Sequence, residues 1–121
     1  MTTKFLSVFI GSGLGGILRF AVQQYFGSEN PMSLIIVNGL GAFGIGVAFQ
    51  FFQGEDVTFF LPREFWMAGL LGGLTTFSGI FPLVEKLASE HLNWQMVVLL
   101  GFHIFLGFYL FNLGIRVVEG R

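Results

Sequence analysis

The residues best suited to chemistry lie between Gly72 and Pro82, inside an otherwise apolar stretch of the chain. This segment holds three glycines, three hydroxyl side chains and one proline. Glycine and proline weaken a helix, and the backbone groups that they free need new partners. Inside a membrane, non-helical backbone is tolerated only within protein or beside a water-filled cavity, where carbonyl groups bind cations and N–H groups bind anions. The segment therefore predicts an ion site on a broken helix, with a merely kinked packing helix as the alternative.

Three isolated polar side chains lie in the other apolar stretches: Arg19, Asn38 and His103. A buried arginine costs at least about 2.5 kcal/mol in a membrane helix, so Arg19 must reach the interface, cap backbone carbonyls or line a wet vestibule. Asn38 is either an interhelical hydrogen-bonding group or a donor to a small dehydrated anion. His103 is more typical of an interhelical hydrogen bond than of a ligand, because no His, Asp or Glu lies at metal-ligand spacing from it.

The composition excludes several classes of function. Hydrophobic residues make up 54% of the 121 residues and charged residues 11%, far below the charge content of a soluble domain. The chain has no cysteine and a net charge of −1, so thiol chemistry and attraction to nucleic acid are not expected. No catalytic triad, carboxylate pair or nucleophile elbow is present in the sequence. We therefore expect a membrane protein that is not an enzyme.

Charged and polar segments divide the chain into apolar stretches, each close to the roughly 20 residues that a membrane-spanning helix needs. Backbone polar groups in lipid must be bonded within their own segment, so we expect helices. A signal peptide is not expected, since Arg19 interrupts the first stretch and three more stretches follow. The predicted fold is one all-α domain, residues 1–121, with four transmembrane helices at about Phe5–Phe26, Met32–Phe52, Glu64–Val84 and Trp94–Ile115. The third helix is expected to be broken in the middle of the membrane.

Two further patterns concern packing and orientation. Gly11 and Gly15 form a small-xxx-small pair, which is typical of helices in close contact. The expected side of the termini carries Lys4, Arg63, Arg116 and Arg121, whereas the opposite side carries Lys86 alone. The positive-inside rule then places the termini in the cytoplasm and the chain in the cell membrane.

Three segments of the sequence resemble the Fluc/CrcB family of fluoride channels: Gly13–Phe20, Pro31–Phe43 and Gly72–Ser78. Their order and spacing fit the family, the four-helix layout covers the whole chain, and the third segment is the most specific. The resemblance implies a subunit that lowers cytoplasmic fluoride by passive efflux. It also implies an inverted (antiparallel) dimer in membrane lipid, with two fluoride pathways and a central structural Na⁺ ion.

The resemblance assigns roles to individual positions. Asn38 resembles the pore-lining asparagine, and Phe77 the first of two pore phenylalanines. Gly72 and Thr75 resemble the residues whose backbone carbonyls bind the central sodium ion. Arg19 resembles the arginine of the first helix near a vestibule.

The chain also departs from the family pattern. Ile80 stands at the second phenylalanine position, unless Phe81 takes that role after a shift of one residue. Ser33–Leu34 stands where the family has Gly-Thr, so the pore threonine is absent. Ser78 and Thr76 add hydroxyl groups near the predicted site. The last helix offers further pore candidates in Tyr109 and Asn112.

These departures leave several interpretations open. Two inverted subunits share each pathway, so one altered copy need not abolish conduction, and the uneven count of positive residues favours one half of a heterodimer with fixed orientation. A non-conducting structural subunit is a second possibility. A small proton-coupled multidrug exporter is less favoured, since neither of the first two predicted helices has the carboxylate that its chemistry requires.

Overall fold

The computed structural model describes residues 1–27, 30–54, 61–91 and 93–120. Glu55 and Asp56, which lie between the second and third predicted helices, are outside the described residues. Arg121, which was counted among the positive residues beside the termini, is also outside them. The described chain is helical and contains no strand. Its elements are α1 (Thr2–Phe26), α2 (Pro31–Phe51), the π-helix η1 (Phe65–Leu71), α3 (Gly72–Leu74), α4 (Ile80–Ser89) and α5 (Asn93–Glu119).

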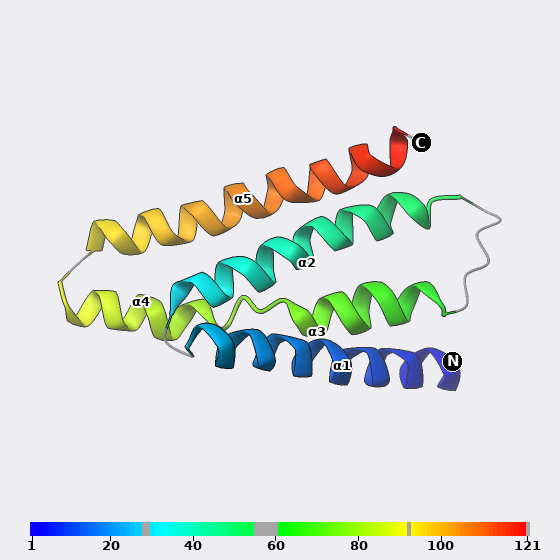
Figure 1. Ribbon diagram of the computed structural model, residues 1–121, viewed down its shortest axis with the longest axis horizontal. Helices are drawn as coiled ribbons and strands as arrows, with labels where there is room; N and C mark the ends of the chain where they lie inside the picture. The colour runs from blue at the N-terminus through cyan, green and yellow to red at the C-terminus, as the bar shows by residue number, and fades with distance from the viewer. Residues whose placement is uncertain (28–29, 55–60, 92, 121) are drawn as a thin grey trace.

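The helices form two layers that lie one on the other (Figure 1). One layer pairs α1 with η1 and α3, and the other pairs α2 with α5. The chain runs in one direction along α1, back along α2, forward again along η1, α3 and α4, and back along α5. The start of α1 and the end of α5 therefore lie at the same end of the molecule. The short α4 continues the line of α3 beyond an interruption and packs against α5.

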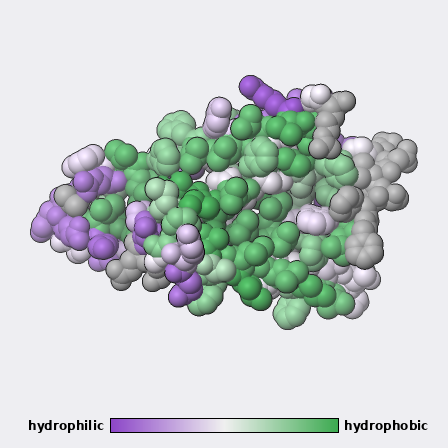
Figure 2. All heavy atoms as spheres, viewed as in Figure 1, coloured by the Kyte–Doolittle hydropathy of each residue, from purple (hydrophilic) through white to green (hydrophobic). Residues whose placement is uncertain are grey.

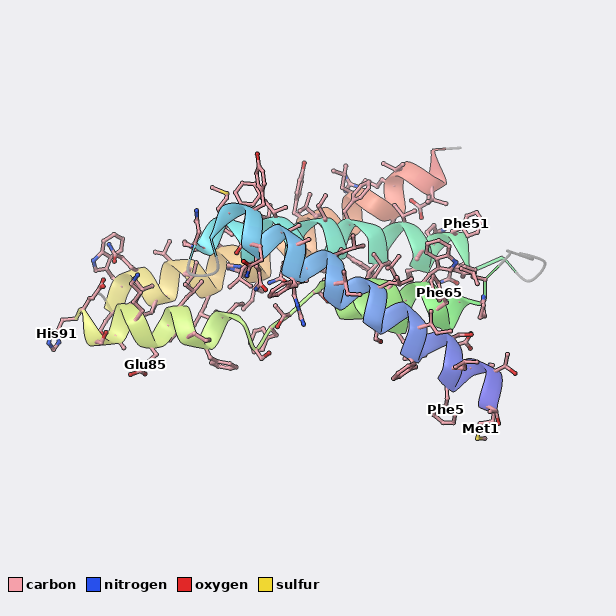
Figure 3. The ribbon with its side chains drawn as sticks, turned by 60° about the horizontal axis from the view of Figure 1, so that its bottom comes forward. Met1, Phe5, Phe51, Phe65, Glu85 and His91 are labelled. Carbon is pink, nitrogen blue, oxygen red and sulfur yellow. The ribbon has the colours of Figure 1, made fainter. Side chains whose placement is uncertain are left out.

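Three helices, α1, α2 and α5, are long and apolar enough to cross a membrane. Figure 2 shows apolar side chains across the middle of one face, with polar side chains gathered mostly at the end where α4 meets α5. Many large apolar side chains point outward, as Phe5 does near the start of α1 in Figure 3. Water cannot cover such a surface favourably, so this all-helical fold is built for lipid or for another apolar subunit.

The predicted third span, Glu64–Val84, needs correction. Helix α3 ends at Leu74, and α4 begins at Ile80 and continues to Ser89. Residues 85–89, which lie between the third and fourth predicted helices, are therefore helical. The helix continues because Leu83 and Leu87 are four residues apart and share one face, which lines a cavity against α5. Pro82 does not cause the interruption, since it lies in the first turn of α4, where no intrahelical N–H bond is lost.

Glycines bring α1 into backbone contact with η1 and α3. A Cβ atom added to Gly11 would lie 2.6 Å from the carbonyl oxygen of Phe65, and one added to Gly73 would lie 2.5 Å from that of Ser12. A Cβ on Gly15 would meet the Leu70 carbonyl oxygen and the Leu74 nitrogen. The predicted close-packing face of the first helix is thereby confirmed.

Glycines also bring α2 and α5, the helices of the second layer, into backbone contact. A Cβ atom added to Gly114 of α5 would lie 2.8 Å from the backbone nitrogen of Val47 in α2, and one added to Gly46 would meet the Phe111 carbonyl oxygen. Both layers therefore depend on positions where no side chain larger than hydrogen fits.

Two local contacts fix the ends of helices. Asn30 caps α2, because its side-chain Oδ1 accepts the N–H of Met32 at 3.0 Å, with Pro31 in the first turn. Lys4 Nζ lies 2.9 Å from Glu64 Oε1 and joins the start of α1 to the start of η1. The hydrogen bond from Lys4 lowers the pKa of the Glu64 carboxyl group.

The glycine contacts predict opposite outcomes for two substitutions in one helix. We expect Gly15→Ala to lower the free energy of unfolding by about 1–3 kcal/mol, because its methyl group would overlap the η1 and α3 backbone. Gly13→Ala is the matched control, since a Cβ there meets nothing within 4 Å, and alanine favours the helix by up to about 1 kcal/mol. Thermal unfolding of the purified protein in detergent measures both, and equal melting temperatures would contradict the packing argument.

Candidate functional site

The backbone leaves the helical conformation between α3 and α4. Thr75 still donates its N–H to the Leu71 carbonyl oxygen at 3.1 Å, but its own φ and ψ, −83° and 151°, are extended. Helical turns resume only where Ile80 N–H donates to the Phe77 carbonyl oxygen at 3.1 Å. The peptide groups between these points need partners from other elements.

Asn38 of α2 supplies those partners to Thr76. The Thr76 N–H donates to Asn38 Oδ1 at 2.8 Å, and Asn38 Nδ2 donates to the Thr76 carbonyl oxygen at 3.0 Å. The side-chain amide thus pairs with the backbone of the interruption as one peptide group pairs with another. This is the interhelical hydrogen bond that the sequence offered as one interpretation of Asn38. One hydrogen of Nδ2 remains for a further partner, because a primary amide carries two.

The hydroxyl groups of the segment serve its local structure. Thr76 Oγ1 accepts the N–H of Gly79 at 3.1 Å and lies 3.1 Å from Ser78 Oγ. Thr75 Oγ1 donates back to the Leu71 carbonyl oxygen at 3.1 Å. Thr76 therefore supports the turn that leads into α4, and Thr75 closes the end of α3.

Arg19 reaches the same segment from α1. Its Nη1 donates to the Thr75 carbonyl oxygen at 3.3 Å, in a partly buried position. Of the three environments expected for this arginine, the structure therefore contains the contact with a backbone carbonyl. This contact places a positive charge beside the interruption.

A cavity of about 280 Å³ opens beside the interruption. Three of the predicted pore residues line it, Asn38 from α2, Phe77 from the interruption and Ile80 from α4, and α5 contributes His103. The full lining is Asn38, Ala42, Ile45, Thr75, Phe77, Ile80, His103, Ile104 and Gly107. We call this cavity the central groove. Its lining contains amide, hydroxyl, imidazole and aromatic groups but no carboxylate, lysine or arginine.

The candidates for the two pore phenylalanine positions, Phe77, Ile80 and Phe81, differ in their exposure. Ile80 is 2% exposed, whereas Phe77 and Phe81 are 65% and 57% exposed. The rings of Phe77 and Phe81 pack edge to face, with centroids 5.6 Å apart and planes at 87°. Ile80, and not Phe81, thus lies at the groove wall within one chain.

Tyr109 and Asn112, the pore candidates on α5, do not line the central groove. Tyr109 is 62% exposed, and the Asn112 side chain donates to the Phe108 carbonyl oxygen of its own helix at 2.8 Å. The prediction that His103 forms an interhelical hydrogen bond is wrong. Its Nδ1 lies 2.9 Å from the carbonyl oxygen of Leu99, which belongs to the same helix, α5. Sequence reasoning thus missed His103 as a residue of the groove, although its isolation in an apolar helix marked it as unusual.

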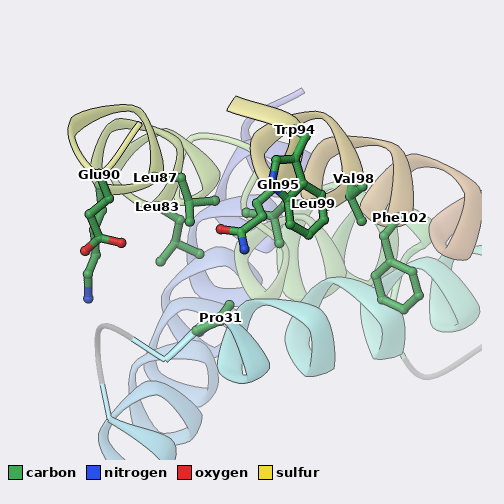
Figure 4. A pocket seen from close by; sticks show the side chains of 10 residues that line it. Pro31, Leu83, Leu87, Glu90, Trp94, Gln95, Val98, Leu99 and Phe102 are labelled. Carbon is green, nitrogen blue, oxygen red and sulfur yellow. The ribbon is translucent and has the colours of Figure 1, made fainter. Parts of the chain in front are cut away.

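A larger cavity lies elsewhere in the described part of the chain. Figure 4 shows this space of about 510 Å³, which lies between α4, α5 and the start of α2. Its lining is mostly apolar, and Lys86, Glu90 and Gln95 are its polar residues. None of the predicted site residues lines it. Cavity volume alone would therefore have placed the functional site away from the interruption.

Comparison with known proteins finds one matching family and several relatives of similar length. The model of the family described as CrcB-like protein, Camphor Resistance (CrcB), matches residues 6–115. A "Fluoride-specific ion channel FluC" from Aeromonas salmonicida is 29% identical over 120 residues, 96% of each chain. Its namesake from Thermus thermophilus is 33% identical over 119 residues, 94% of each chain. One from Serratia proteamaculans is 39% identical over 106 residues, 83% of this chain and 82% of the relative.

The two hydrogen bonds of Asn38 lead to a prediction about stability. We expect Asn38→Ala to lower the free energy of unfolding by about 2–4 kcal/mol, because the N–H and the carbonyl oxygen of Thr76 would both lose a partly buried partner. Asn112→Ala is the matched control, since that amide is exposed and bonds only within its own helix. Chemical denaturation in detergent compares the two, and equal losses would show that Asn38 does not support the interruption.

Proposed function

Because this chain belongs to the family of CrcB-like proteins, we propose that it is a subunit of a fluoride-selective channel that lowers cytoplasmic fluoride by passive efflux. The observation that carries the proposal is the central groove, where a side-chain amide and an aromatic ring meet beside an interrupted helix. The chain is a multi-pass membrane protein and conducts an ion without chemical conversion.

The groove suits a small anion because it combines donors with neutrality. The second hydrogen of Asn38 Nδ2 replaces part of the hydration shell of the ion. The edge of the Phe77 ring carries partial positive charge and faces an anion without the desolvation cost of an arginine. A lining without a full charge keeps the ion from being held too tightly to leave.

The hydrogen bonds to Thr76 also set the direction of that donor. Asn38 is held at both ends of its amide, by the Thr76 N–H and by the Thr76 carbonyl oxygen. An amide fixed in this way cannot rotate to present its oxygen to the ion. The same contact that stabilises the interruption thereby favours an anion over a cation.

One chain forms only part of such a pathway. The groove is open, and Phe77 and Phe81 are largely exposed beside it. We assign its missing wall to a second, antiparallel subunit, which would also cover the apolar surface of α5. Tyr109 and Asn112, exposed in one chain, are then available to the pathway across that interface.

The two subunits need not be identical. Lys4, Arg63 and Arg116 flank the end of the bundle that holds the termini, whereas Lys86 lies near the opposite end. This asymmetry favours one orientation, with the termini in the cytoplasm. A chain of fixed orientation requires a homologous partner of opposite orientation to build an antiparallel dimer, so we propose a heterodimer.

A structural Na⁺ ion fits the donors at the end of α3. The last carbonyls of a helix have no intrahelical N–H partner, and the extended Thr75 turns the following N–H toward Asn38. The family resemblance assigns the ion to the carbonyl oxygens of Gly72 and Thr75, together with ligands from the second subunit. The Gly72 carbonyl oxygen lies 3.4 Å from the Thr75 hydroxyl oxygen. Arg19 now contacts the Thr75 carbonyl oxygen, and it would have to share that oxygen with the ion. The ion would supply positive charge that joins the two subunits at their centre.

A non-conducting structural subunit is the second candidate. The position of the absent pore threonine holds Leu34, which is 4% exposed, and the neighbouring Ser33 hydroxyl donates to the Asn30 carbonyl oxygen at 2.8 Å. This part of α2 is packed within the chain and offers no free polar group. If the partner supplied a complete pathway, this chain would serve only as its scaffold.

Fluoride efflux from liposomes tests the proposed function. We expect vesicles that contain this chain, alone or with a homologous fluoride-channel subunit, to release fluoride and retain chloride. Phe77→Leu should lower the efflux about tenfold, because it removes an aromatic edge worth roughly 1 kcal/mol or more. Phe9→Leu, at an exposed position of α1 that lines neither described cavity, is the matched control. Efflux that is indifferent to Phe77 would favour the structural subunit, and absence of any fluoride efflux would contradict the channel proposal.

Labelling of single cysteines tests the fixed orientation, since the chain has no cysteine of its own. Glu119→Cys and Ser89→Cys place exposed thiols at opposite ends of the bundle. We expect an impermeant maleimide added outside intact cells to modify the Ser89→Cys variant and not the Glu119→Cys variant. Equal labelling of both variants would show dual orientation and therefore a homodimer.

A further inference from the structure

The cavity of about 510 Å³ between α4 and α5 has no part in the proposed ion pathway. Most of its lining residues are apolar, among them Leu83 of α4 and Val98 of α5, and its charged residues are Lys86 and Glu90. Figure 4 shows Glu90 at one end of this space and Phe102 at the other. The cavity therefore offers apolar walls and two opposite charges to the same ligand.

The order of these groups along α4 runs from apolar to positive to negative. The helix begins at Ile80, which lines the central groove, and ends at Ser89, near the connection to α5. Leu83, Lys86 and Glu90 follow one another in that direction. They are three and four residues apart and share one face of α4, which lines the cavity. Lys86 thus lies about 6 Å deeper along the helix axis than Glu90.

The start of α5 places the charged end of the cavity at the membrane interface. Trp94 and Gln95 lie in the first turn of α5, whereas Phe102 lies about two turns further along its apolar span. Tryptophan is typical of the interface, where its apolar ring and its polar N–H group each meet a suitable environment. Trp94 is 67% exposed, so this end of the cavity lies at the level of the lipid headgroups.

The antiparallel subunit proposed above does not account for this cavity. Phe102 lines the cavity and Ile104 lines the central groove, although they are neighbours but one in α5. At about 100° per residue, the two side chains lie on roughly opposite sides of the helix. A subunit that closes the groove meets the side of Ile104 and leaves the side of Phe102 to another partner.

We propose that this cavity binds one phospholipid with an ethanolamine headgroup. An acyl chain packs against Val98 and Phe102, and the phosphate accepts hydrogen bonds from the Lys86 ammonium and the Gln95 amide. The ethanolamine ammonium donates to the Glu90 carboxylate. In a phospholipid the phosphate is closer to the acyl chains than the amine is, which matches the deeper position of Lys86. The inference goes beyond the proposed function and requires no conduction of fluoride.

The choice of headgroup follows from the hydrogen bonds that each headgroup can form. An ionised carboxylate only accepts, so Glu90 requires a donor. The ammonium of ethanolamine has three N–H groups and a positive charge, which makes its contact with a carboxylate charge-assisted. The quaternary ammonium of choline has no N–H group, and a glycerol headgroup has no positive charge. Ethanolamine therefore suits the cavity better than either.

Native mass spectrometry of the purified protein in detergent measures this preference. The three probes are dioleoyl phosphatidylethanolamine, phosphatidylcholine and phosphatidylglycerol, which share their acyl chains and differ only in headgroup. We expect the first to bind about fivefold more tightly than the other two, as for one charge-assisted contact at an exposed site. Equal affinities for the three lipids would overturn the inference.

Exchange of the two charges tests their order along α4. The double variant Lys86→Glu with Glu90→Lys keeps the net charge and leaves opposite charges four residues apart, so we expect it to fold as the unmodified chain does. The phosphate would then meet a carboxylate, and we expect the preference for ethanolamine to fall below about twofold. A preference that survives the exchange would show that the cavity does not recognise the headgroup.

Single substitutions and the assembled channel supply the controls. Glu90→Gln should weaken the binding of phosphatidylethanolamine, whereas Glu85→Gln, exposed on α4 and outside the lining of both cavities, should not. Equal effects of the two would contradict the site. If the preference is lost when a homologous subunit is present, that subunit covers the cavity and the lipid site is wrong. Fluoride efflux is measured separately, so its absence would contradict the channel and leave the lipid site standing.

Discussion

The pairing of Asn38 with the Thr76 backbone is the contact on which the site depends. An apolar environment does not tolerate an unbonded peptide group, so a helix can be interrupted there only if another element bonds the freed groups. One side chain does this here, with hydrogen bonds of 2.8 and 3.0 Å to the same residue. The interruption in turn places Phe77 and Ile80 at the groove and exposes the carbonyls at the end of α3.

The glycines set how closely the helices that carry this contact approach one another. Gly11 and Gly15 bring α1 against the backbone of η1 and α3, and Gly46 and Gly114 bring α2 against α5. Arg19, one turn beyond Gly15, then reaches the Thr75 carbonyl oxygen from α1. The contacts of Arg19 and Asn38 with the backbone need this precision, because a carbonyl or N–H group cannot extend toward its partner as a long side chain does.

Much of this arrangement was predictable from residue types, and the remainder depended on contacts between distant segments. Three glycines, three hydroxyls and a proline predicted an unusual segment, and the spacing of Gly11 and Gly15 predicted a packing face. The bounds of the third span were wrong because charge was used to divide the chain, whereas Leu83 and Leu87 continue α4 past Glu85. The partner of Asn38 lies 38 residues away, so no local pattern could name it. The position of His103 in the groove likewise depends on how α5 packs against α2.

The most direct test of the account is the selectivity and rate of efflux through Asn38→Asp. A carboxylate of the same shape keeps the acceptor for the Thr76 N–H. It removes both donors of Nδ2, the one to the Thr76 carbonyl oxygen and the one that faces the ion, and it adds a negative charge. The account predicts a folded subunit whose fluoride efflux falls at least about a hundredfold, since the ion would meet a like charge at close range in the groove. Unchanged fluoride efflux through a folded Asn38→Asp subunit would show that the ion does not pass this amide, and it would contradict the central claim.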